Sequence, residues 1–295
     1  MKYSNPKIPE GINSSDENPI KEFALLASGI IAIAIVLIFS LSMLLDWGSK
    51  FLPFSYEQQV ATPIVNEYLS EFSNESNEVD SYLQQLADDI VPLMALNDDM
   101  SITLHYVDQD TVNGMATLGG NIFIFRGLLE KLPNENALVM LLAHEIAHVK
   151  LRHPVKALSK GVLISLVLTI VSGQSNSDMS WLLSGASQLA LLDFSRSQEQ
   201  DADDEATLLN QHYYQHTQGA IELFEVLLAE SETASISTLA LFNSHPNISE
   251  RIDTVLKSSQ ANQWPIQGKL VEIPDEIKQQ LANDRLNQEQ AVKEE

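Results

Sequence analysis

The stretch Ala143-His144-Glu145-Ile146-Ala147-His148 carries two histidines four residues apart, with a glutamate directly after the first. An α-helix has about 3.6 residues per turn, so positions four apart lie on one face and both imidazoles can reach a single ion. The preceding residues, Leu138 to Ala143, are apolar and helix-forming, Asn134 is a suitable N-cap, and Pro154 follows the segment. The sequence therefore predicts a buried helix that offers two nitrogen ligands.

A second acidic segment, Glu199-Gln200-Asp201-Ala202-Asp203, begins fifty-one residues after the second histidine. A catalytic zinc site takes three protein ligands and leaves its fourth position to water, and a carboxylate from another helix is the usual partner of two histidines. We therefore expect one zinc ion (Zn2+) per chain, bound by His144, His148 and Glu199. The alternative is that two core histidines happen to be spaced by four, and the downstream acid pair argues against it.

Two further carboxylates are expected to serve this site without binding the ion. Glu145 lies beside the open coordination position and can accept a proton from water, so it is the candidate general base. Asp203 lies one helical turn after Glu199, where it can hydrogen-bond the outward nitrogen of a ligand histidine, His144 in our interpretation, and fix its tautomer.

The chain also resembles a known group of enzymes. It is similar to the membrane-associated zinc endopeptidases that include the CAAX prenyl proteases, the HtpX heat-shock protease, the mitochondrial inner-membrane quality-control protease and the periplasmic outer-membrane-assembly proteases. Four features in the family's order, spanning about half of the chain, carry the likeness: Val112 to Gly120 leading into Ile122 to Leu129; HExxH followed by Arg152-His153; Ser195 to Glu199 with Ala202-Asp203; and Ser244-His245-Pro246 with Arg251-Ile252.

The resemblance implies roles for two residues near the end of the matched region. His245 would approach the metal, either to assist the developing oxyanion or to block the open position as a switch, and the alternative is an ordinary loop histidine. Arg251 would steady that loop or the substrate. Independently of the resemblance, Arg196 lies three residues before Glu199 and could brace its carboxylate, although an ordinary ion pair explains the spacing equally well.

The resemblance also implies that an edge strand holds an extended peptide over the metal by main-chain hydrogen bonds. Asn113, Gly119 and Gly120 are the expected residues of this substrate edge, and a simple hairpin turn is the alternative reading of the glycine pair. The family usually has Asn-Ala-Phe-Ala and a proline before the glycines, whereas Gly114, Met115 and Leu118 stand here. This departure concerns the shape of the substrate edge and leaves the metal site unaffected.

A long apolar segment near the N-terminus predicts a membrane anchor. Phe23 to Leu45 contains no charged residue, and its 23 residues would span about 35 Å as a helix. A cleaved signal peptide is the alternative, but the apolar stretch is longer than such peptides use. Three lysines precede the span and one follows it closely, which favours a single pass through the inner membrane with the catalytic domain outside the cytoplasm, periplasmic in a Gram-negative bacterium.

The composition excludes some partners and suggests four regions. A net charge of -23 in 295 residues argues against nucleic acid, because phosphate binding needs clustered Lys and Arg. Zero cysteines remove any disulfide argument.

We expect a disordered N-terminus (1–19), a transmembrane anchor (20–47), a zinc metallopeptidase domain (53–260) and a polar C-terminal tail (261–295) that forms an exposed helix or a disordered end.

The predicted fold class is α+β, a mostly helical zincin-type domain with a small sheet and one transmembrane helix. Ile102 to Val107 reads as a strand, and a second strand begins at Ile122. Two apolar stretches between the ligand helices, Gly161 to Val171 and Trp181 to Leu192, are too short to span a bilayer. They are expected to be core helices, and a hairpin that covers the cleft or touches the membrane is the alternative.

Together these features predict a membrane-anchored zinc endopeptidase that cleaves unfolded or misassembled membrane or envelope proteins. A single span cannot build the multi-helix chamber that cleavage of a prenylated tail requires. The competing hypothesis is a membrane-anchored chaperone or adaptor with a structural or regulatory zinc site, and Glu145 argues against it because a structural site has no use for a base. The physiological substrate and the oligomeric state stay open.

Overall fold

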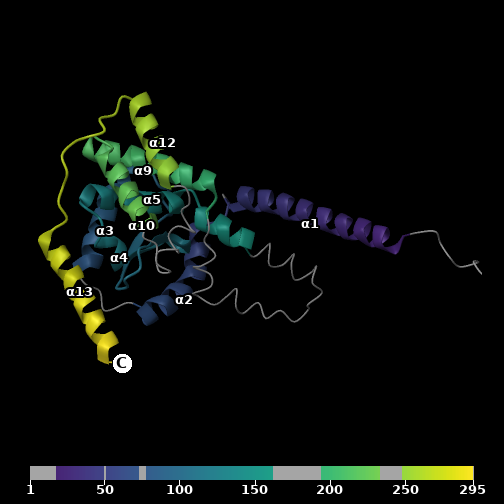
Figure 1. Ribbon diagram of the computed structural model, residues 1–295, viewed down its shortest axis with the longest axis horizontal. Helices are drawn as coiled ribbons and strands as arrows, with labels where there is room; N and C mark the ends of the chain where they lie inside the picture. The colour runs from purple at the N-terminus through teal and green to yellow at the C-terminus, as the bar shows by residue number, and fades with distance from the viewer. Residues whose placement is uncertain (1–17, 50, 73–77, 162–193, 233–247, 295) are drawn as a thin grey trace, which may run out of the picture.

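A computed structural model describes residues 18–49, 51–72, 78–161, 194–232 and 248–294 of the chain. Its first helix, α1 (Pro19–Ser49), projects away from the remaining elements (Figure 1). The segment Ile20–Ser49 has a hydropathy of 2.8 in its most apolar window, and none of that window is buried. By length and composition it could cross a membrane, a test that a signal sequence also passes.

The rest of the described chain is mostly helical, as expected. Helix α5 lies at the centre, and α9 and α10 pack along it (Figure 1). The helices are α2 (Phe54–Phe72), α3 (Glu78–Ile90), α4 (Arg126–Leu129), α5 (Glu135–Lys150), α9 (Arg196–Tyr214), α10 (Gln218–Glu232), α12 (Ile248–Ala261) and α13 (Asp275–Glu294), with 3-10 turns η1 (Val91–Leu93) and η2 (Leu118–Gly120).

A three-stranded sheet completes the α+β fold and confirms the predicted class. Its strands are β1 (Thr103–Val107), β2 (Gly114–Ala116) and β3 (Asn121–Phe125), arranged in the order β1-β3-β2. Strand β1 runs parallel to β3 and β2 runs antiparallel to it. Both strands predicted from the sequence are therefore present, and β2 lies at one edge of this sheet, next to α5.

Helix α5 is buried on all sides because its sequence is apolar around most of its circumference. Every residue from Asn136 to Val149 is buried. The side chain of Asn134 accepts a hydrogen bond from the Ala137 amide at 3.0 Å, which is the expected N-cap. The helix ends at Lys150, and a second helical stretch begins at His153. The HExxH histidines therefore lie on a rigid central element, close to its C-terminal end.

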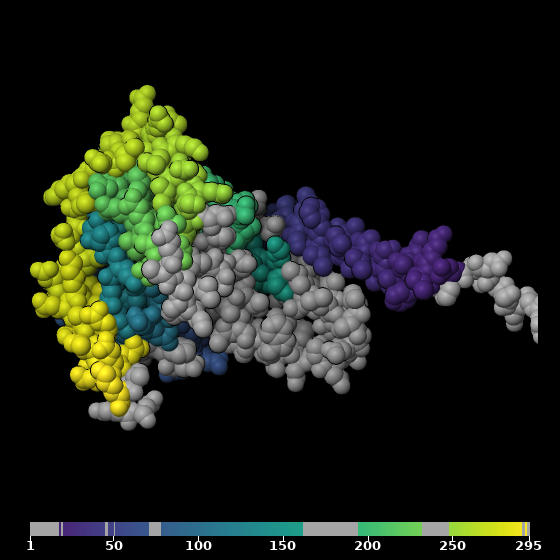
Figure 2. All heavy atoms as spheres, in the orientation of Figure 1, coloured from purple at the N-terminus to yellow at the C-terminus, as the bar shows by residue number. Residues whose placement is uncertain are grey.

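The C-terminal region, expected to be an exposed helix or a disordered end, is a mostly exposed helix with one buried face. It forms α13, one face of which is buried against the rest of the fold, with Ile277 and Leu281 only 5% and 4% exposed. The Tyr106 hydroxyl on β1 donates to Asp284 at 2.9 Å. The space-filling view shows the C-terminal residues, in yellow, along one side of the molecule (Figure 2). Apolar residues at four-residue spacing explain why a polar segment docks here.

Several predicted features fall outside the described residues. They are the apolar stretches Gly161 to Val171, of which only the first residue is described, and Trp181 to Leu192, together with the segment that carries His245. The expectations for them stay as stated.

Candidate metal centre

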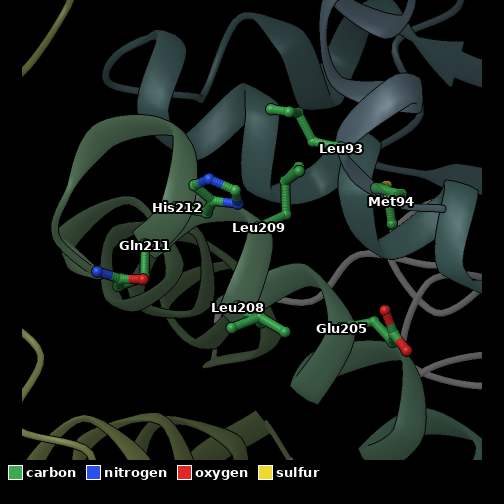
Figure 3. Close-up of a pocket in the computed structure, with 7 residues that line it drawn as sticks. All are labelled: Leu93, Met94, Glu205, Leu208, Leu209, Gln211 and His212. Atoms are coloured by element: carbon green, nitrogen blue, oxygen red, sulfur yellow. The ribbon is translucent and has the colours of Figure 1, made fainter.

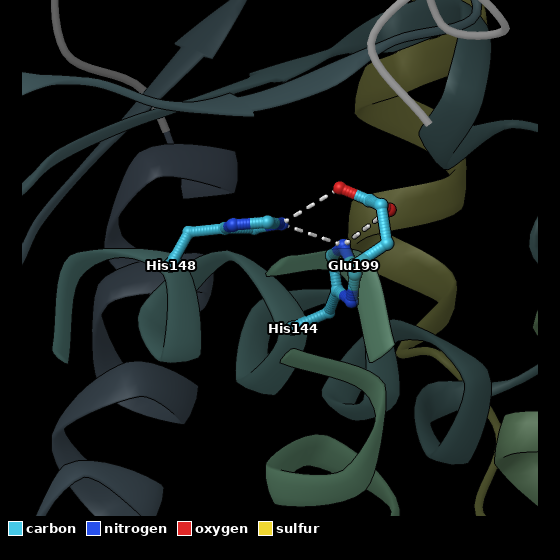
Figure 4. A group of neighbouring side chains, drawn as sticks. All are labelled: His144, His148 and Glu199. Atoms are coloured by element: carbon cyan, nitrogen blue, oxygen red, sulfur yellow. Dashed lines mark hydrogen bonds and ion pairs between the residues drawn. The ribbon is translucent and has the colours of Figure 1, made fainter. Parts of the chain in front are cut away.

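The three predicted ligands meet in the structure, although they come from two helices. His144 and His148 extend from α5 and Glu199 from the first turn of α9 (Figure 4). The two Nε2 atoms are 3.0 Å apart. The Glu199 carboxylate oxygens lie 3.6 Å from Nε2 of His144 and 3.4 Å from Nε2 of His148. All three side chains are buried.

This arrangement fits a zinc ion. Zinc–nitrogen and zinc–oxygen bonds of about 2.1 Å in tetrahedral geometry place neighbouring ligand atoms about 3.4 Å apart. The three separations observed, 3.0, 3.4 and 3.6 Å, are close to that value. Two imidazole nitrogens and one carboxylate are also a donor set that zinc prefers.

The capping of α9 explains how Glu199 reaches the histidines. Ser195 is the N-cap, and its side chain and that of Gln198 form a reciprocal capping box. Glu199 follows in the first helical turn, where a carboxylate also interacts favourably with the helix dipole. Helix α9 then packs along α5, so the start of one helix faces the histidines of the other.

Behind His144 lies a charged pair. Its Nδ1 is 3.0 Å from Oδ1 of Asp203, the partner expected from the sequence. Arg251 of α12 donates to both oxygens of this carboxylate, at 2.7 and 2.5 Å, and its Nη1 lies 3.4 Å from Glu199. Burial opposes ionisation of Asp203, but Arg251 and the hydrogen bond with His144 overcome it and lower the pKa of Asp203.

Arg251 is buried among charged and aromatic side chains. It is 7% exposed, its guanidinium lies 4.4 Å from the Phe224 ring centroid, and it faces Asp203 and Glu199. Its implied role in steadying the loop of His245 or the substrate stays a prediction. Arg196, for which bracing of Glu199 and an ordinary ion pair were the two alternatives, is exposed at the start of α9. Within the described part of the chain no ion pair joins Arg196 to Glu199, and Arg251 occupies that place.

Behind His148 lies a partner that the sequence did not reveal. Its Nδ1 is 2.8 Å from Nδ1 of His153, a residue noted from the sequence only in the Arg152-His153 pair that follows HExxH. The Phe194 ring stacks on His148 at 4.1 Å with an interplanar angle of 18°. Burial, and next the charge of Lys156, lower the pKa of His153 to about 4. The spacing of five residues gives no periodic signal, so only the folded chain shows this contact.

Glu145 points toward the sheet from the same stretch of α5. It is 1% exposed, and a side-chain carbon added to Gly114 of β2 would lie 3.7 Å from its Oε1. The candidate base and the edge strand are therefore close neighbours. Asn113, immediately before β2, is partly buried, and its carbonyl accepts a hydrogen bond from the Phe125 amide at 3.2 Å.

The paired glycines Gly119 and Gly120 lie in a closely packed turn between β2 and β3, and their assignment to the substrate edge stays a prediction. They have φ of +70° and +78°. A side-chain carbon on Gly119 would lie 2.9 Å from Cα of Gln58, and one on Gly120 would lie 1.9 Å from the Ser101 carbonyl oxygen. Both positions face α2 and a loop, so the turn and its close packing require glycine.

A separate cavity of about 240 Å³ lies between η1 and α9 (Figure 3). None of the expected ligands borders it, so the candidate metal centre is defined by its converging side chains rather than by this hollow. The lining residues come from η1 and α9 and their immediate neighbours: Leu93, Met94, Glu205, Leu208, Leu209, Gln211 and His212.

Known proteins share this region of the chain. It is 27% identical over 203 residues to the mitochondrial metalloendopeptidase OMA1 of Schizosaccharomyces pombe, covering 67% of this chain and 59% of that one. It is 36% identical over 110 residues to the beta-barrel assembly-enhancing protease of Yersinia pestis, covering 34% and 22%. It is 30% identical over 156 residues to the metalloprotease YcaL of Escherichia coli, covering 50% and 57%.

In each of these comparisons the alignment covers less than two thirds of the relative's length. The family model for peptidase family M48 matches residues 77–259, which include both ligand helices and most of α12. That match covers more than half of the chain and agrees with the buried histidine and glutamate cluster. The chain belongs to peptidase family M48.

Proposed function

We propose that this protein is a membrane-anchored, zinc-dependent endopeptidase. The observation that carries the proposal is the meeting of His144, His148 and Glu199 within 4.8 Å, beside the buried Glu145. A zinc ion held by these three ligands would polarise a peptide carbonyl and make a coordinated water more acidic.

The residues of the chain supply the proton transfers. Glu145 accepts a proton from the attacking water and then returns it to the leaving amine, which makes it the general base and then the general acid. Asp203 holds Nδ1 of His144, so the Nε2 lone pair of that ring faces the ligand position. Hydrolysis in this scheme is a direct displacement by water and forms no acyl-enzyme.

Strand β2 is the proposed place for the substrate backbone. Asn113, Met115 and Thr117 face β3, because the Asn113 carbonyl and the Thr117 amide bond to it and Met115 pairs with Phe123. In an antiparallel pair the residues between these direct their main-chain groups the other way. Gly114 and Ala116 therefore present amides and carbonyls at the edge next to Glu145, where an extended peptide can add as a further strand.

The relatives suggest the class of substrate and the location. Their names describe a mitochondrial metalloendopeptidase and a beta-barrel assembly-enhancing protease. By analogy we propose unfolded or misassembled membrane or envelope proteins as substrates. The distribution of lysines around α1 supports an inner-membrane anchor with the peptidase domain on the periplasmic side. His245, which lies outside the described residues, stays a predicted modulator of the site.

The test uses the full chain solubilised in detergent, supplied with zinc and an unfolded protein. Wild type is expected to bind one zinc ion per chain and cut the substrate, and a chelator should abolish cutting until zinc returns. Glu145→Gln should bind zinc with unchanged stoichiometry but cut about 10²- to 10⁴-fold more slowly. The matched control is Glu250→Gln, an exposed residue of α12 that should cut at the wild-type rate.

The competing chaperone or adaptor function predicts another outcome. Wild type and Glu145→Gln would then both suppress aggregation of the unfolded protein, and neither would cut it. Equal cutting by wild type and Glu145→Gln would eliminate the proposed role of this carboxylate.

A further inference from the structure

The two histidines of the metal centre have different partners on their outward nitrogens. Nδ1 of His144 faces the Asp203 carboxylate at 3.0 Å, whereas Nδ1 of His148 faces Nδ1 of His153 at 2.8 Å. We infer that His153 is a positioning residue, which accepts a hydrogen bond from Nδ1 of His148 and thereby keeps the Nε2 lone pair of that ring available to the metal. The inference rests on the zinc site of the proposed function.

The direction of this hydrogen bond follows from proton counting. Each neutral imidazole has one N–H and one bare nitrogen. His148 must keep Nε2 bare to bind a metal, so its proton lies on Nδ1 and is donated outward. His153 must then accept with a bare Nδ1 and carry its own proton on Nε2. His153 is 1% exposed, so this contact is shielded from bulk water.

This pairing makes the two ligands unequal. Ligand histidines usually donate their second N–H to a carboxylate, a main-chain carbonyl or water, and a carboxylate raises the basicity of the ring. His144 has such an acceptor in Asp203, which Arg251 fixes from behind. His148 has a neutral imidazole instead. We therefore expect His148 to be the weaker ligand and its binding to depend on the placement of His153.

The chain places His153 by reversing direction immediately after α5. Arg152 has φ of +61°, a left-handed conformation that is uncommon for a residue with a side chain. Its guanidinium forms an ion pair with the buried Glu57 and donates to the Leu52 carbonyl at 2.7 Å. These contacts with α2 and the segment before it hold the turn, so the residue that follows returns toward His148.

An aromatic ring also packs on His148. The Phe194 ring is stacked on His148 and has its centroid 6.0 Å from that of His153. An aromatic ring offers no acceptor to an N–H in its plane, so it restricts the tilt of His148 without replacing the hydrogen bond. Packing and hydrogen bonding thus act on the same ligand from different directions.

Two substitutions separate the hydrogen bond from the volume of the side chain. His153→Leu replaces the imidazole with an apolar side chain of similar size and so removes the hydrogen-bond acceptor. His153→Asn can place an amide oxygen near the position of Nδ1 and retains an acceptor. The control is His216→Leu, because His216 is also buried, at 2%, but its Nδ1 accepts from the Gln218 amide, away from the ligands.

The measurement is zinc affinity, obtained by competition with a chelator on the full chain in detergent, together with the thermal stability of the metal-free protein. His153→Leu should weaken zinc binding about 10- to 100-fold. His153→Asn should stay within about threefold of wild type, and His216→Leu should lower thermal stability without changing zinc affinity. Zinc affinities of His153→Leu within twofold of wild type would overturn the inference, as would equal losses in the Leu and Asn variants.

A measurement on the wild type keeps the inference testable if His153→Leu does not fold. Nitrogen chemical shifts of the zinc-loaded protein labelled at histidine should show His153 unprotonated at Nδ1 and protonated at Nε2, and protonation of His153 at Nδ1 would overturn the inference. Failure of the proposed function looks different: zinc binding would respond to His153 as described, but no substrate would be cut.

Discussion

At the scale of single residues, the site depends on charges that are buried in pairs. Arg251 and Asp203 are 7% and 3% exposed and share two hydrogen bonds. Removing one partner leaves the other buried without compensation, which typically costs about 3–5 kcal/mol. The pair thus stabilises the fold and orients His144 with the same contacts.

A substitution of Arg251 tests this double role. Arg251→Met should lower the free energy of unfolding of the metal-free protein by about 3–5 kcal/mol in urea titrations, because Asp203 stays buried without its cation. The control is Arg285→Met on α13, whose side chain is 49% exposed and whose loss should change stability by less than about 0.5 kcal/mol. Equal stability of Arg251→Met and wild type would show that Asp203 does not need this partner.

Some contacts of the metal centre could be predicted from the sequence, and others could not. Helical periodicity placed His144 beside His148 and Glu199 beside Asp203, and the usual donor set of a catalytic zinc predicted that the two pairs meet. The contacts of His153, Phe194 and Arg251 depend on a chain reversal and on packing between helices, which periodicity does not describe.

At the scale of elements, a partly buried carboxylate joins three helices at the start of α5. Glu135 accepts from the Tyr82 hydroxyl of α3 at 2.9 Å and from the Tyr214 hydroxyl of α9 at 3.0 Å. Burial, and next the charge of Glu135, raise the pKa of both tyrosines. These tyrosines stay protonated in the folded protein at pH values where they ionise in the unfolded chain.

The sign of the pH dependence follows from this difference. Above about pH 10 the unfolded chain binds fewer protons than the folded protein, so the free energy of unfolding falls as pH rises. Tyr82→Phe should cost about 1–3 kcal/mol at pH 7 and reduce the fall above pH 10. Tyr56→Phe, at a position that is 56% exposed, is the control and should leave both unchanged. A slope for Tyr82→Phe as steep as that of wild type would contradict this explanation.

Sequence patterns predicted the strands, but a motif taken from a resemblance does not define the surroundings of its residues. The strands were predicted from alternating and apolar patterns, and the sheet has them. Side-chain carbons added to the glycine pair would meet Gln58 and Ser101. The sequence indicates that glycine is required at these positions but does not show which neighbour approaches them.

At the scale of the whole molecule, the C-terminal helix closes the fold around the sheet. Besides the Tyr106–Asp284 bond, Gln288 of α13 accepts from Arg126 at 2.5 Å and donates to the Asp108 carbonyl at 3.0 Å. These contacts join the end of the chain to the ends of β1 and β3. Residues 261–295 were expected to form a polar tail, and the few apolar residues spaced by four along α13 explain its buried face.

Docking of α13 predicts unequal effects of two leucine substitutions. Leu281→Ala removes a side chain that is 4% exposed and should lower the free energy of unfolding by about 2–5 kcal/mol. Leu286→Ala, on the same helix but 50% exposed, should cost less than about 1 kcal/mol. Urea titrations of the full chain in detergent measure both, and similar small losses would indicate that α13 does not stabilise the core in solution.

The central claim is that two helices bring His144, His148 and Glu199 to one zinc ion. A crystal structure of the zinc-loaded full chain, with anomalous diffraction recorded at the zinc edge, tests it most directly. We predict one anomalous peak per chain, about 2.0–2.2 Å from Nε2 of both histidines and from a carboxylate oxygen of Glu199. A peak at another position, or a zinc ion that binds the histidines while Glu199 faces away, would contradict the account.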